Sequence, residues 1–303
     1  MRQIGAVDIG GSKIAAGIVL EDGTLLDRIE CPTEAELGFM NAIGRIESTL
    51  RELVDRCGAI DGIGIACPGP LDPFAGVIGN VGTLPGWNNG HLAEEVATRF
   101  GLSVAVENDA DAAALAECAW GTVQPDSTLI YVTVSTGIGG GIVQSGQLYR
   151  GVNGAHPELG HQLIDPSGPL CYCGLSGCWE SLASGTAMSA HFHKVAPDCR
   201  LPAAAEICAR ARQGDLVAAQ ALRRTANYLA LGLANLVTLF APHSIRLGGG
   251  VMRSSDLFLD DVRTQVQRMC TQVPSELTSI TTSKLGSETG LLGAAQSWLL
   301  RNS

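Results

Sequence analysis

The chain has 303 residues, a formal net charge of −10 and an isoelectric point of about 5.0. This length allows a large core, divided between two lobes with a cleft between them. The acidic balance excludes a protein that binds the phosphate backbone of nucleic acids, because such a protein needs a basic face.

Ten cysteines raise the question of disulfide bonds, and the N-terminal sequence argues against them. It lacks the apolar core and cleavage site of a secretory signal, because Asp8 and Lys13 interrupt its apolar run. The apolar segment 228–241 is too short to cross a membrane and ends at Pro242. We therefore expect a cytoplasmic protein with no membrane partner and with free thiols outside one metal-binding array, at Cys31, Cys57, Cys67, Cys118, Cys199, Cys208 and Cys270.

Strands and helices alternate in the first half of the chain. Short apolar runs predict strands at 4–9, 14–20, 24–31, 63–66 and 103–107. Apolar residues at helical spacing predict helices at 35–57 and 91–101. Asn108 or Asp109 is expected to cap an alanine-rich helix that extends to Trp120.

A strand–turn–strand unit at 129–145 repeats the shape of the unit at 6–19, with Ser135–Gly141 as its turn in place of Gly10–Lys13. Two such units predict two related lobes, each of which directs a hairpin turn toward a shared cleft. The remainder is predicted to be mainly helical, at 184–196, 203–213, 215–241 and 256–271, with a short strand at 244–247 and a last helix that begins at 289–293.

The two glycine-rich turns are candidate anion sites. Paired glycines between strands let backbone N–H groups approach a phosphate closely. Asp8 would hold hydrated Mg²⁺ and Lys13 would reach a phosphate, although Gly-Gly hairpins are also common without such a role, and the first turn is not a P-loop because no helix follows it. The residues predicted to bind ATP here are Asp8, Gly10, Gly11, Ser12, Lys13, Thr136, Gly137 and Gly139.

A third glycine cluster, at 248–250 with Thr289-Gly290, has two interpretations of equal weight. Stacked glycines would let an adenine ring lie flat between two helices, or they would simply allow close packing. On the first interpretation, Gly249 and Gly250 belong to the ATP site.

Three carboxylates crowd the strand-to-helix junction at 107–111. A helix N-terminus stabilises a carboxylate, so Asp109 is explained as a cap alone. A cap does not need Asn108 and Asp111 beside it, however, and an aspartate at this place would accept the proton of a substrate hydroxyl that attacks a phosphoryl group. Together with the two anion sites, this junction predicts a phosphoryl transferase.

The segment 158–180 contains His161, Cys171, Cys173 and Cys178, in a His-x9-Cys-x-Cys-x4-Cys array. Three thiolates and an imidazole are the ligands of a closed, tetrahedral Zn²⁺ site. The alternative of three buried cysteines and one surface histidine is disfavoured, because four ligands lie within eighteen residues. Glu158 and Glu180 flank the array, and with His161 they suit the hydroxyls of a polyol acceptor.

These motifs resemble the ROK family (repressors, uncharacterised frames and sugar kinases) over nearly the whole chain, with 158–180 as the most specific part. The other motifs occur in the family's order: DIGGSK at 8–13, PGPLD at 68–72, LPGW at 84–87, ENDA at 107–110 and STGIGGG at 135–141. The resemblance implies an α/β, two-lobe ATPase fold of the actin–hexokinase type with a structural zinc loop. We expect a small N-terminal lobe of residues 1–115 and about 288–303, a large lobe of 116–287 with the zinc loop, and a nucleotide cleft between them.

The resemblance also implies roles for individual residues. Asp109 is the expected catalytic base, and the hexose is expected to contact Gly69, Asn108, Asp109, Glu158, His161 and Glu180. The reaction is ATP-dependent phosphorylation of the 6-hydroxyl of a hexose, with Mg²⁺. Two positions depart from the family: Thr83 and Asp111 stand where asparagine is common, which alters the outer sugar contacts and adds charge near the base.

The segments around Pro70 and LPGW are more similar to the family's glucokinases than to its N-acetylmannosamine kinases. Glucose is the expected substrate, while N-acetylmannosamine, mannose and fructose stay open because one hydroxyl depends on one or two contacts. A sugar-responsive transcriptional regulator is disfavoured, since only seven residues precede Asp8 and the chain is acidic. A kinase-dead sugar-binding protein is disfavoured by Asp109. The expected partners are a hexose and ATP, without nucleic acid, in a homodimer or homotetramer, although the apolar helix at 228–240 fits the core better than an interface.

Overall fold

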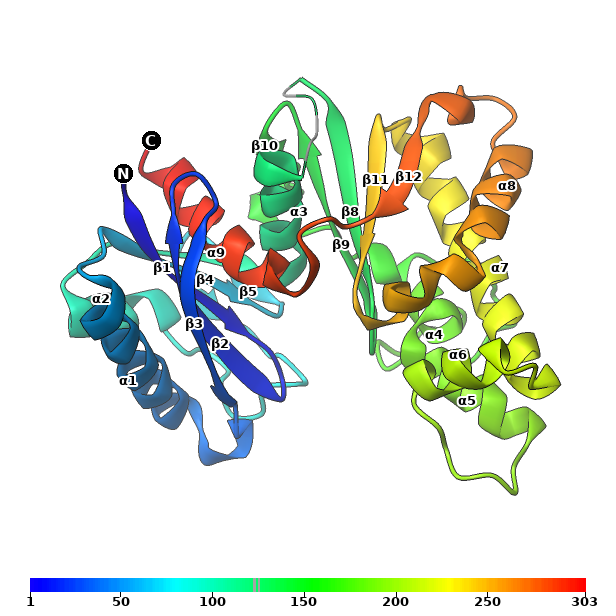
Figure 1. The fold of residues 1–303 in the computed structure, drawn as a ribbon, viewed down its shortest axis with the longest axis horizontal. Coiled ribbons are helices and arrows are strands. Elements are labelled where there is room, and N and C mark those ends of the chain that lie inside the picture. Colours follow the sequence, from blue (N-terminus) through cyan, green and yellow to red (C-terminus); the bar gives the residue numbers. More distant parts are fainter. Residues whose placement is uncertain (122–123, 125) are drawn as a thin grey trace. The chain divides into compact units, whose positions relative to one another are not determined.

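The structure is a computed structural model that describes residues 1–121, 124 and 126–303 (Figure 1). The chain divides into two compact units. Unit 1 comprises Met1–Asp126, Gly141–Pro157 and Lys284–Ser303, and unit 2 comprises Ser127–Gly140 and Glu158–Ser283. This division differs from the predicted lobe boundaries, because helix α3 (Asp109–Trp120) continues without a break past residue 115 and the chain returns to unit 1 at Gly141.

Unit 1 is built on a five-stranded sheet with the order β3-β2-β1-β4-β7. Strands β1, β2 and β3 are antiparallel, while β4 is parallel to β1 and β7 is parallel to β4. The carboxyl ends of β1, β4 and β7 therefore meet at one edge of the sheet. The strands are β1 (Gln3–Ile9), β2 (Lys13–Leu20), β3 (Leu25–Pro32), β4 (Gly62–Cys67) and β7 (Val104–Asn108), and a separate hairpin contains β5 (Leu71–Asp72) and β6 (Val77–Ile78).

Helices cover both faces of this sheet (Figure 1). Helices α1 (Phe39–Cys57) and α2 (Leu92–Phe100) bury their apolar sides in one core, and α9 (Thr289–Arg301) packs with α3 in a second core rich in alanine. Gly64 permits this approach, since a Cβ there would overlap the carbonyl of Ala294. The two cores hold the carboxyl edge of the sheet and the start of α3 in fixed positions.

Unit 2 contains most of a second five-stranded sheet, with the order β10-β9-β8-β11-β12. Strand β11 is parallel to both β8 and β12. Its strands are β8 (Thr128–Val134), β9 (Ile138–Gln144), β10 (Gln147–Leu148), β11 (Ser244–Gly248) and β12 (Ser279–Thr282), and the end of β9 and all of β10 belong to unit 1.

The long helix α7 (Leu216–Phe240) organises the helical part of unit 2. It packs against α4 (Trp179–Ala183), α5 (Gly185–Val195), α6 (Ala204–Arg212) and α8 (Leu259–Met269). Trp179 is fully buried, and its indole lies against Gly232, where a Cβ would overlap the ring. Short 3₁₀ segments complete the described chain: η1 (Ala35–Leu37), η2 (Val152–Gly154), η3 (Leu159–His161), η4 (Gly250–Leu257), η5 (Ser275–Leu277) and η6 (Gly286–Glu288).

Most predicted elements are confirmed with small shifts of their ends. The turn predicted at Ser135–Gly141 is shorter, because β9 already begins at Ile138 and includes Gly139–Gly141. The helix predicted at 35–57 is divided, because Gly38 has a φ of 89° and separates η1 from α1. The repeated strand–turn–strand unit is present as β1–β2 and β8–β9. The ten cysteines form no disulfide bond, and the described helices include none that is long and apolar enough to span a membrane.

Candidate active site

The base predicted from the sequence lies at the carboxyl edge of the unit 1 sheet, where β7 passes into α3. Asn108 caps the helix, since its Oδ1 accepts hydrogen bonds from the backbone N–H groups of Ala110 (2.9 Å) and Asp111 (3.2 Å). Asp109 Oδ1 accepts a bond from the N–H of Ala110 at 2.8 Å, and the Asp109 side chain is exposed. One residue therefore serves as the cap, and the next presents its carboxylate to solvent.

Two further predicted residues lie beside this turn in unit 1. A Cβ on Gly69 would lie 3.2 Å from Nδ2 of Asn108, so the backbone of Gly69 approaches that amide closely. Asp8 ends β1 on the same edge, and burial, together with the Asp109 carboxylate, raises its pKa to about 6. The structure therefore brings Asp8, Gly69, Asn108 and Asp109 together.

The first glycine-rich turn, Gly10–Ser12, joins β1 to β2 at this edge. The N–H of Gly10 donates to the carbonyl of Lys13 at 2.8 Å. Lys13, predicted to reach a phosphate, instead donates its ammonium to Glu30 Oε1 at 2.9 Å on the neighbouring strand β3. Thr83 packs on the turn, since its Cβ lies 3.0 Å from the place of a Cβ on Gly11. Thr83 thus contacts the candidate phosphate turn.

The second glycine-rich turn lies in unit 2, between β8 and β9. Its backbone binds Glu180, because the N–H of Ile138 donates to Glu180 Oε2 at 2.8 Å and a Cβ on Gly137 would overlap that carboxylate. Burial raises the pKa of Glu180. Thr136 is exposed at the tip of the turn, and Gly139 is half-buried beyond it.

The third glycine cluster separates into two places. Gly249, with a φ of 90°, packs against the backbone of Val134, and the place of a Cβ on Gly250 is in van der Waals contact with Ser135 Oγ at 3.7 Å. These two glycines therefore adjoin the second turn within unit 2. Gly290 belongs to unit 1, and a Cβ there would overlap the Asp8 carboxylate. Close packing explains Gly249 and Gly290, while Gly250 is less crowded.

The four predicted metal ligands form one cluster in unit 2. Their ligand atoms all lie within 4.8 Å of one another, with Cys173 and Cys178 sulfurs 3.5 Å apart and His161 Nδ1 3.7 Å from Cys171 Sγ. A tetrahedral Zn²⁺ with bonds of about 2.0–2.3 Å separates its ligands by roughly 3.5–3.8 Å. The cluster Cys171, Cys173, Cys178 and His161 therefore fits a structural zinc ion in ligand type and spacing.

Tyr172 lies at this cluster and was given no role by the sequence. Its hydroxyl lies 2.9 Å from His161 Nε2, the nitrogen that faces away from Cys171. Tyr172 is 82% exposed; the partial burial of its phenol, and the charges of Glu180 and Glu158, raise the pKa of Tyr172 to about 12. His161 is the predicted site residue that contacts this phenol, while the two carboxylates act on it by their charge. In the sequence, the only indication of this contact is the position of Tyr172 between Cys171 and Cys173.

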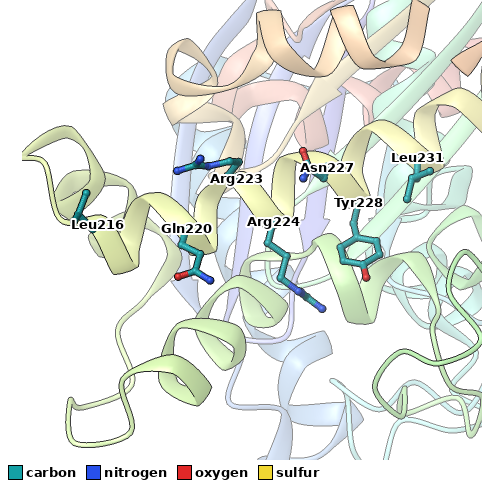
Figure 2. Close-up of a pocket in the computed structure, with 7 residues that line it drawn as sticks. All are labelled: Leu216, Gln220, Arg223, Arg224, Asn227, Tyr228 and Leu231. Carbon is teal, nitrogen blue, oxygen red and sulfur yellow. The ribbon is translucent and has the colours of Figure 1, made fainter. Parts of the chain in front are cut away.

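An open groove runs along α7 in unit 2, lined by Leu216, Gln220, Arg223, Arg224, Asn227, Tyr228 and Leu231 (Figure 2). None of these is a predicted site residue. Arg224 lies over the ring of Tyr228 at 4.7 Å, and the Tyr228 hydroxyl donates to Asp165 Oδ2 at 2.8 Å. The indole N–H of Trp179 donates to the Tyr228 carbonyl at 2.9 Å. Helix α7 thus contacts the segment 158–180 through Tyr228, which binds both Asp165 and Trp179.

The predicted residues are divided between the units. Unit 1 carries the turn that contains Asn108 and Asp109, called the base turn below, and the first glycine-rich turn. Unit 2 carries the second turn, the zinc cluster, and the carboxylates of Glu158 and Glu180. Arg150 and His156, which the sequence did not single out, lie against the acidic residues behind Asp109 in unit 1.

The chain is similar to two groups of known sugar kinases. The glucokinase of Thermotoga maritima is 34% identical over 301 residues, which cover 95% of each chain. The N-acetylmannosamine kinase of Escherichia coli is 36% identical over 252 residues, 81% of this chain and 82% of that protein.

Solved structures show the same fold. The ROK hexokinase of Thermus thermophilus superposes with a TM-score of 0.88 at 34% identity, covering 99% of this chain and all of that one. A ROK family glucokinase from Streptomyces griseus, in complex with glucose and AMPPNP, gives 0.85 at 33% identity, with 99% and 100% coverage. The predicted α/β fold of the hexokinase type is confirmed. Since residues 4–301 also match the ROK family as a whole, the chain belongs to the ROK family.

Proposed function

We propose that this protein is an ATP-dependent hexose kinase that phosphorylates the 6-hydroxyl of a hexose, with glucose as its preferred substrate. The observation that carries the proposal is the exposed carboxylate of Asp109, held on the first turn of α3 beside Asn108, Gly69 and Asp8. The glucokinase of Thermotoga maritima and the glucose–AMPPNP complex of the Streptomyces griseus relative support the substrate pair. We further propose that the two units serve as the two lobes of the kinase, with the boundaries of the units in place of those predicted, that the nucleotide binds in a cleft between the lobes, and that the protein is cytoplasmic and forms a homodimer or homotetramer.

In this mechanism Asp109 accepts the proton of the sugar 6-hydroxyl. The oxygen then attacks the γ-phosphorus of ATP in line, and ADP leaves. Asn108, Gly69, Glu158, His161 and Glu180 orient the sugar, because carboxylates and amides accept and donate hydrogen bonds in fixed directions. The base already has its orientation in the ligand-free protein, since its Oδ1 is bound to the N–H of Ala110.

The phosphates of ATP would be held by backbone N–H groups of the two glycine-rich turns, at Gly11, Ser12, Thr136, Gly137 and Gly139, with Gly249 and Gly250 beside the second turn. The N–H of Gly10 donates to Lys13, so Gly10 would instead shape the first turn. Lys13 would exchange Glu30 for a phosphate oxygen. Bound Mg²⁺ would neutralise charge that develops on the phosphates, and Asp8 is the carboxylate placed to hold it through water. Zn²⁺ would fold the segment that bears Glu158 and Glu180.

The choice of sugar is tested by direct competition. A 2-acetamido group needs both space and a partner for its amide, and the loop Gly69-Pro70-Leu71 offers no side-chain donor. The carbonyl of Pro70 is already occupied by the N–H of Gly79 at 2.8 Å. An unpartnered amide would cost about 1–3 kcal/mol. Glucose should therefore exceed N-acetylmannosamine in kcat/KM by roughly tenfold to a hundredfold. The reverse order would replace glucose by N-acetylmannosamine, as the 36% identical relative suggests, and would leave the base and zinc site unchanged.

The raised pKa of Asp8 can be tested without measuring turnover. Its pKa is raised to about 6 by burial and by Asp109, whereas the unfolded chain ionises near 3.8. Folding therefore disfavours the ionised form of Asp8. The free energy of unfolding is highest below about pH 4, decreases as the pH rises to about 6, and stays lower above pH 6. Asp8→Asn should stabilise the ligand-free protein by up to about 3 kcal/mol at pH 8 and have no such effect at pH 4.

The same variant should lose most Mg²⁺-dependent activity, because the carboxylate is absent. Asp22→Asn is the matched control. Hydrogen bonds from Thr24 lower the pKa of this exposed aspartate, so its substitution should slightly destabilise the protein above pH 4. Thermal unfolding of both variants at pH 4 and pH 8 decides the matter. A lower melting temperature for Asp8→Asn than for wild type at pH 8 would show that the fold does not disfavour the ionised form of Asp8.

A further inference from the structure

A buried carboxylate lies directly behind the base turn, and the proposed reaction does not use it. Asp111 is fully buried in the first turn of α3. Within the described residues, neither of its carboxylate oxygens accepts an aligned hydrogen bond. Because an uncompensated charge in the interior is costly, a carboxylate at this position requires a positive or hydrogen-bonding neighbour.

His156 is that neighbour. Its Nδ1 lies 2.9 Å from Asp111 Oδ2, as a close ion-pair contact, and its side chain is only 15% exposed. Burial raises the pKa of Asp111, and the contact with His156 opposes that effect. The backbone leaves room for the carboxylate, since a Cβ on Gly141 would lie 2.8 Å from Asp111 Oδ1.

The nearby arginines are engaged elsewhere. Arg150 contacts Glu107, with Nη2 at 2.5 Å from Oε2 and Nη1 at 3.2 Å from Oε1, while its distance to Asp111 is 3.9 Å. Arg301 also contacts Glu107, at 3.2 Å. Glu107 is buried and contacts both guanidinium groups, but its single charge does not balance two cations. His156, at 2.9 Å, is therefore the nearest cation to Asp111, and Arg150, at 3.9 Å, is a weaker second one.

The Asp111–His156 pair connects two segments that carry proposed site residues, namely the turn of Asn108 and Asp109 and the segment that leads to Glu158. The backbone N–H of Asp111 donates to the Asn108 side chain, which caps the turn that presents Asp109. His156 lies two residues before Glu158, at the point where the chain passes from unit 1 to unit 2. We propose that the Asp111–His156 pair is a positioning element of the kinase, which fixes the turn bearing Asn108 and Asp109 and anchors to it the segment that continues into Glu158.

This proposal rests on the proposed function, and the net charge of the pair gives it a distinctive test. The charged groups that face the pair are Glu107, Arg150 and Arg301, and on the other side of the turn Asp109 with Asp8 and Lys13. Asp109 must be ionised to accept a proton. A net negative charge behind it would move the acid limb of the kcat/KM profile to higher pH, and a net positive charge would move it to lower pH.

The test compares Asp111→Asn, His156→Gln and the double variant in the intact chain, with glucose, ATP and Mg²⁺. Each single variant should lower kcat/KM for glucose by roughly tenfold or more, because a small displacement of the base is costly. The acid limb should move up in His156→Gln, down in Asp111→Asn, and back toward wild type in the double variant. His193→Gln, an exposed histidine of α5, is the control and should match wild type.

Opposite shifts of the acid limb that cancel in the double variant support the proposed role of the pair. A loss of stability alone does not produce such shifts. Shifts of the same sign, or wild-type profiles in both single variants, overturn it. If His156→Gln does not fold, Asp111→Asn and the double variant carry the same comparison. If wild type phosphorylates no hexose, the proposed function fails separately. Amide exchange at Ala110 and Asp111 then decides: it should accelerate in Asp111→Asn and in the double variant, because both lack the pair, and unchanged exchange overturns the positioning role.

Discussion

Asp109→Asn is expected to lower kcat for hexose phosphorylation by about 10²–10⁴-fold, the usual contribution of a placed general base. The amide has the shape of the carboxylate but cannot accept the proton of the 6-hydroxyl. Its oxygen can still accept the N–H of Ala110, which the carboxylate binds at 2.8 Å, so the turn should keep its form. Thermal stability and sugar affinity should therefore change little, which steady-state kinetics and calorimetric titration with glucose measure separately.

Asp215→Asn is the matched control for that variant. Asp215 also begins a helix, α7, where its Oδ1 accepts from the N–H groups of Val217 and Ala218 at 2.9 and 3.1 Å. Asparagine caps helices as well as aspartate does, and Asp215 has no predicted role in the reaction. Asp215→Asn should therefore keep wild-type turnover. Near-wild-type kcat in Asp109→Asn would show that the base lies elsewhere.

The strands and helices could be predicted from the sequence because most of them are amphipathic or fully apolar over lengths that suit one type of element. The strand Gly62–Cys67 is buried throughout, and α1 places Ile43, Ile46, Leu50 and Leu53 on one buried side. Gly38 divided one predicted helix, since a single residue with positive φ interrupts a pattern that otherwise continues. The boundaries of the lobes were harder to predict from the sequence, because they depend on contacts between segments that are far apart in the chain.

The candidate site was predictable where its residues are close in sequence. The zinc ligands and the Asn108–Asp109 turn are local motifs, and the structure places each set together. Pairings across long distances were not predictable. Examples are Lys13 with Glu30, Tyr172 with His161, and Asp111 with His156, since each depends on which side chains the fold brings together. The acidic residues at 107–111 were a signal that buried cations must lie nearby, but not of their identity.

Gly290 shows why a glycine is an ambiguous signal. It was considered for the adenine site, whereas in the structure it lies against the Asp8 carboxylate. A glycine reports that something approaches the backbone closely, and a side chain satisfies that requirement as well as a ligand does. Within the third glycine cluster, Gly250 is the least crowded, because no neighbour lies closer than 3.7 Å to the place of its Cβ.

The zinc site should determine both the stability of unit 2 and its affinity for sugar. We expect about one Zn²⁺ per chain with metal–sulfur distances near 2.3 Å. Cys173→Ser should weaken metal affinity by at least roughly ten- to hundredfold and lower the melting temperature. It should also raise the KM for glucose more than the KM for ATP, because the loop carries Glu158 and Glu180 on either side of the cluster. Elemental analysis, thermal unfolding and kinetics on protein purified without chelator measure these effects.

Cys199→Ser is the control that separates loss of the metal from loss of a thiol. Cys199 is exposed, as Cys173 is, and it lies outside the cluster. Its side chain can therefore change without affecting a ligand. If Cys199→Ser and Cys173→Ser had equal zinc content and equal melting temperatures, the four residues would not form a structural metal site. The cluster geometry argues for the opposite result, because the sulfurs of Cys173 and Cys178 lie 3.5 Å apart, which is the separation of two ligands of one tetrahedral Zn²⁺.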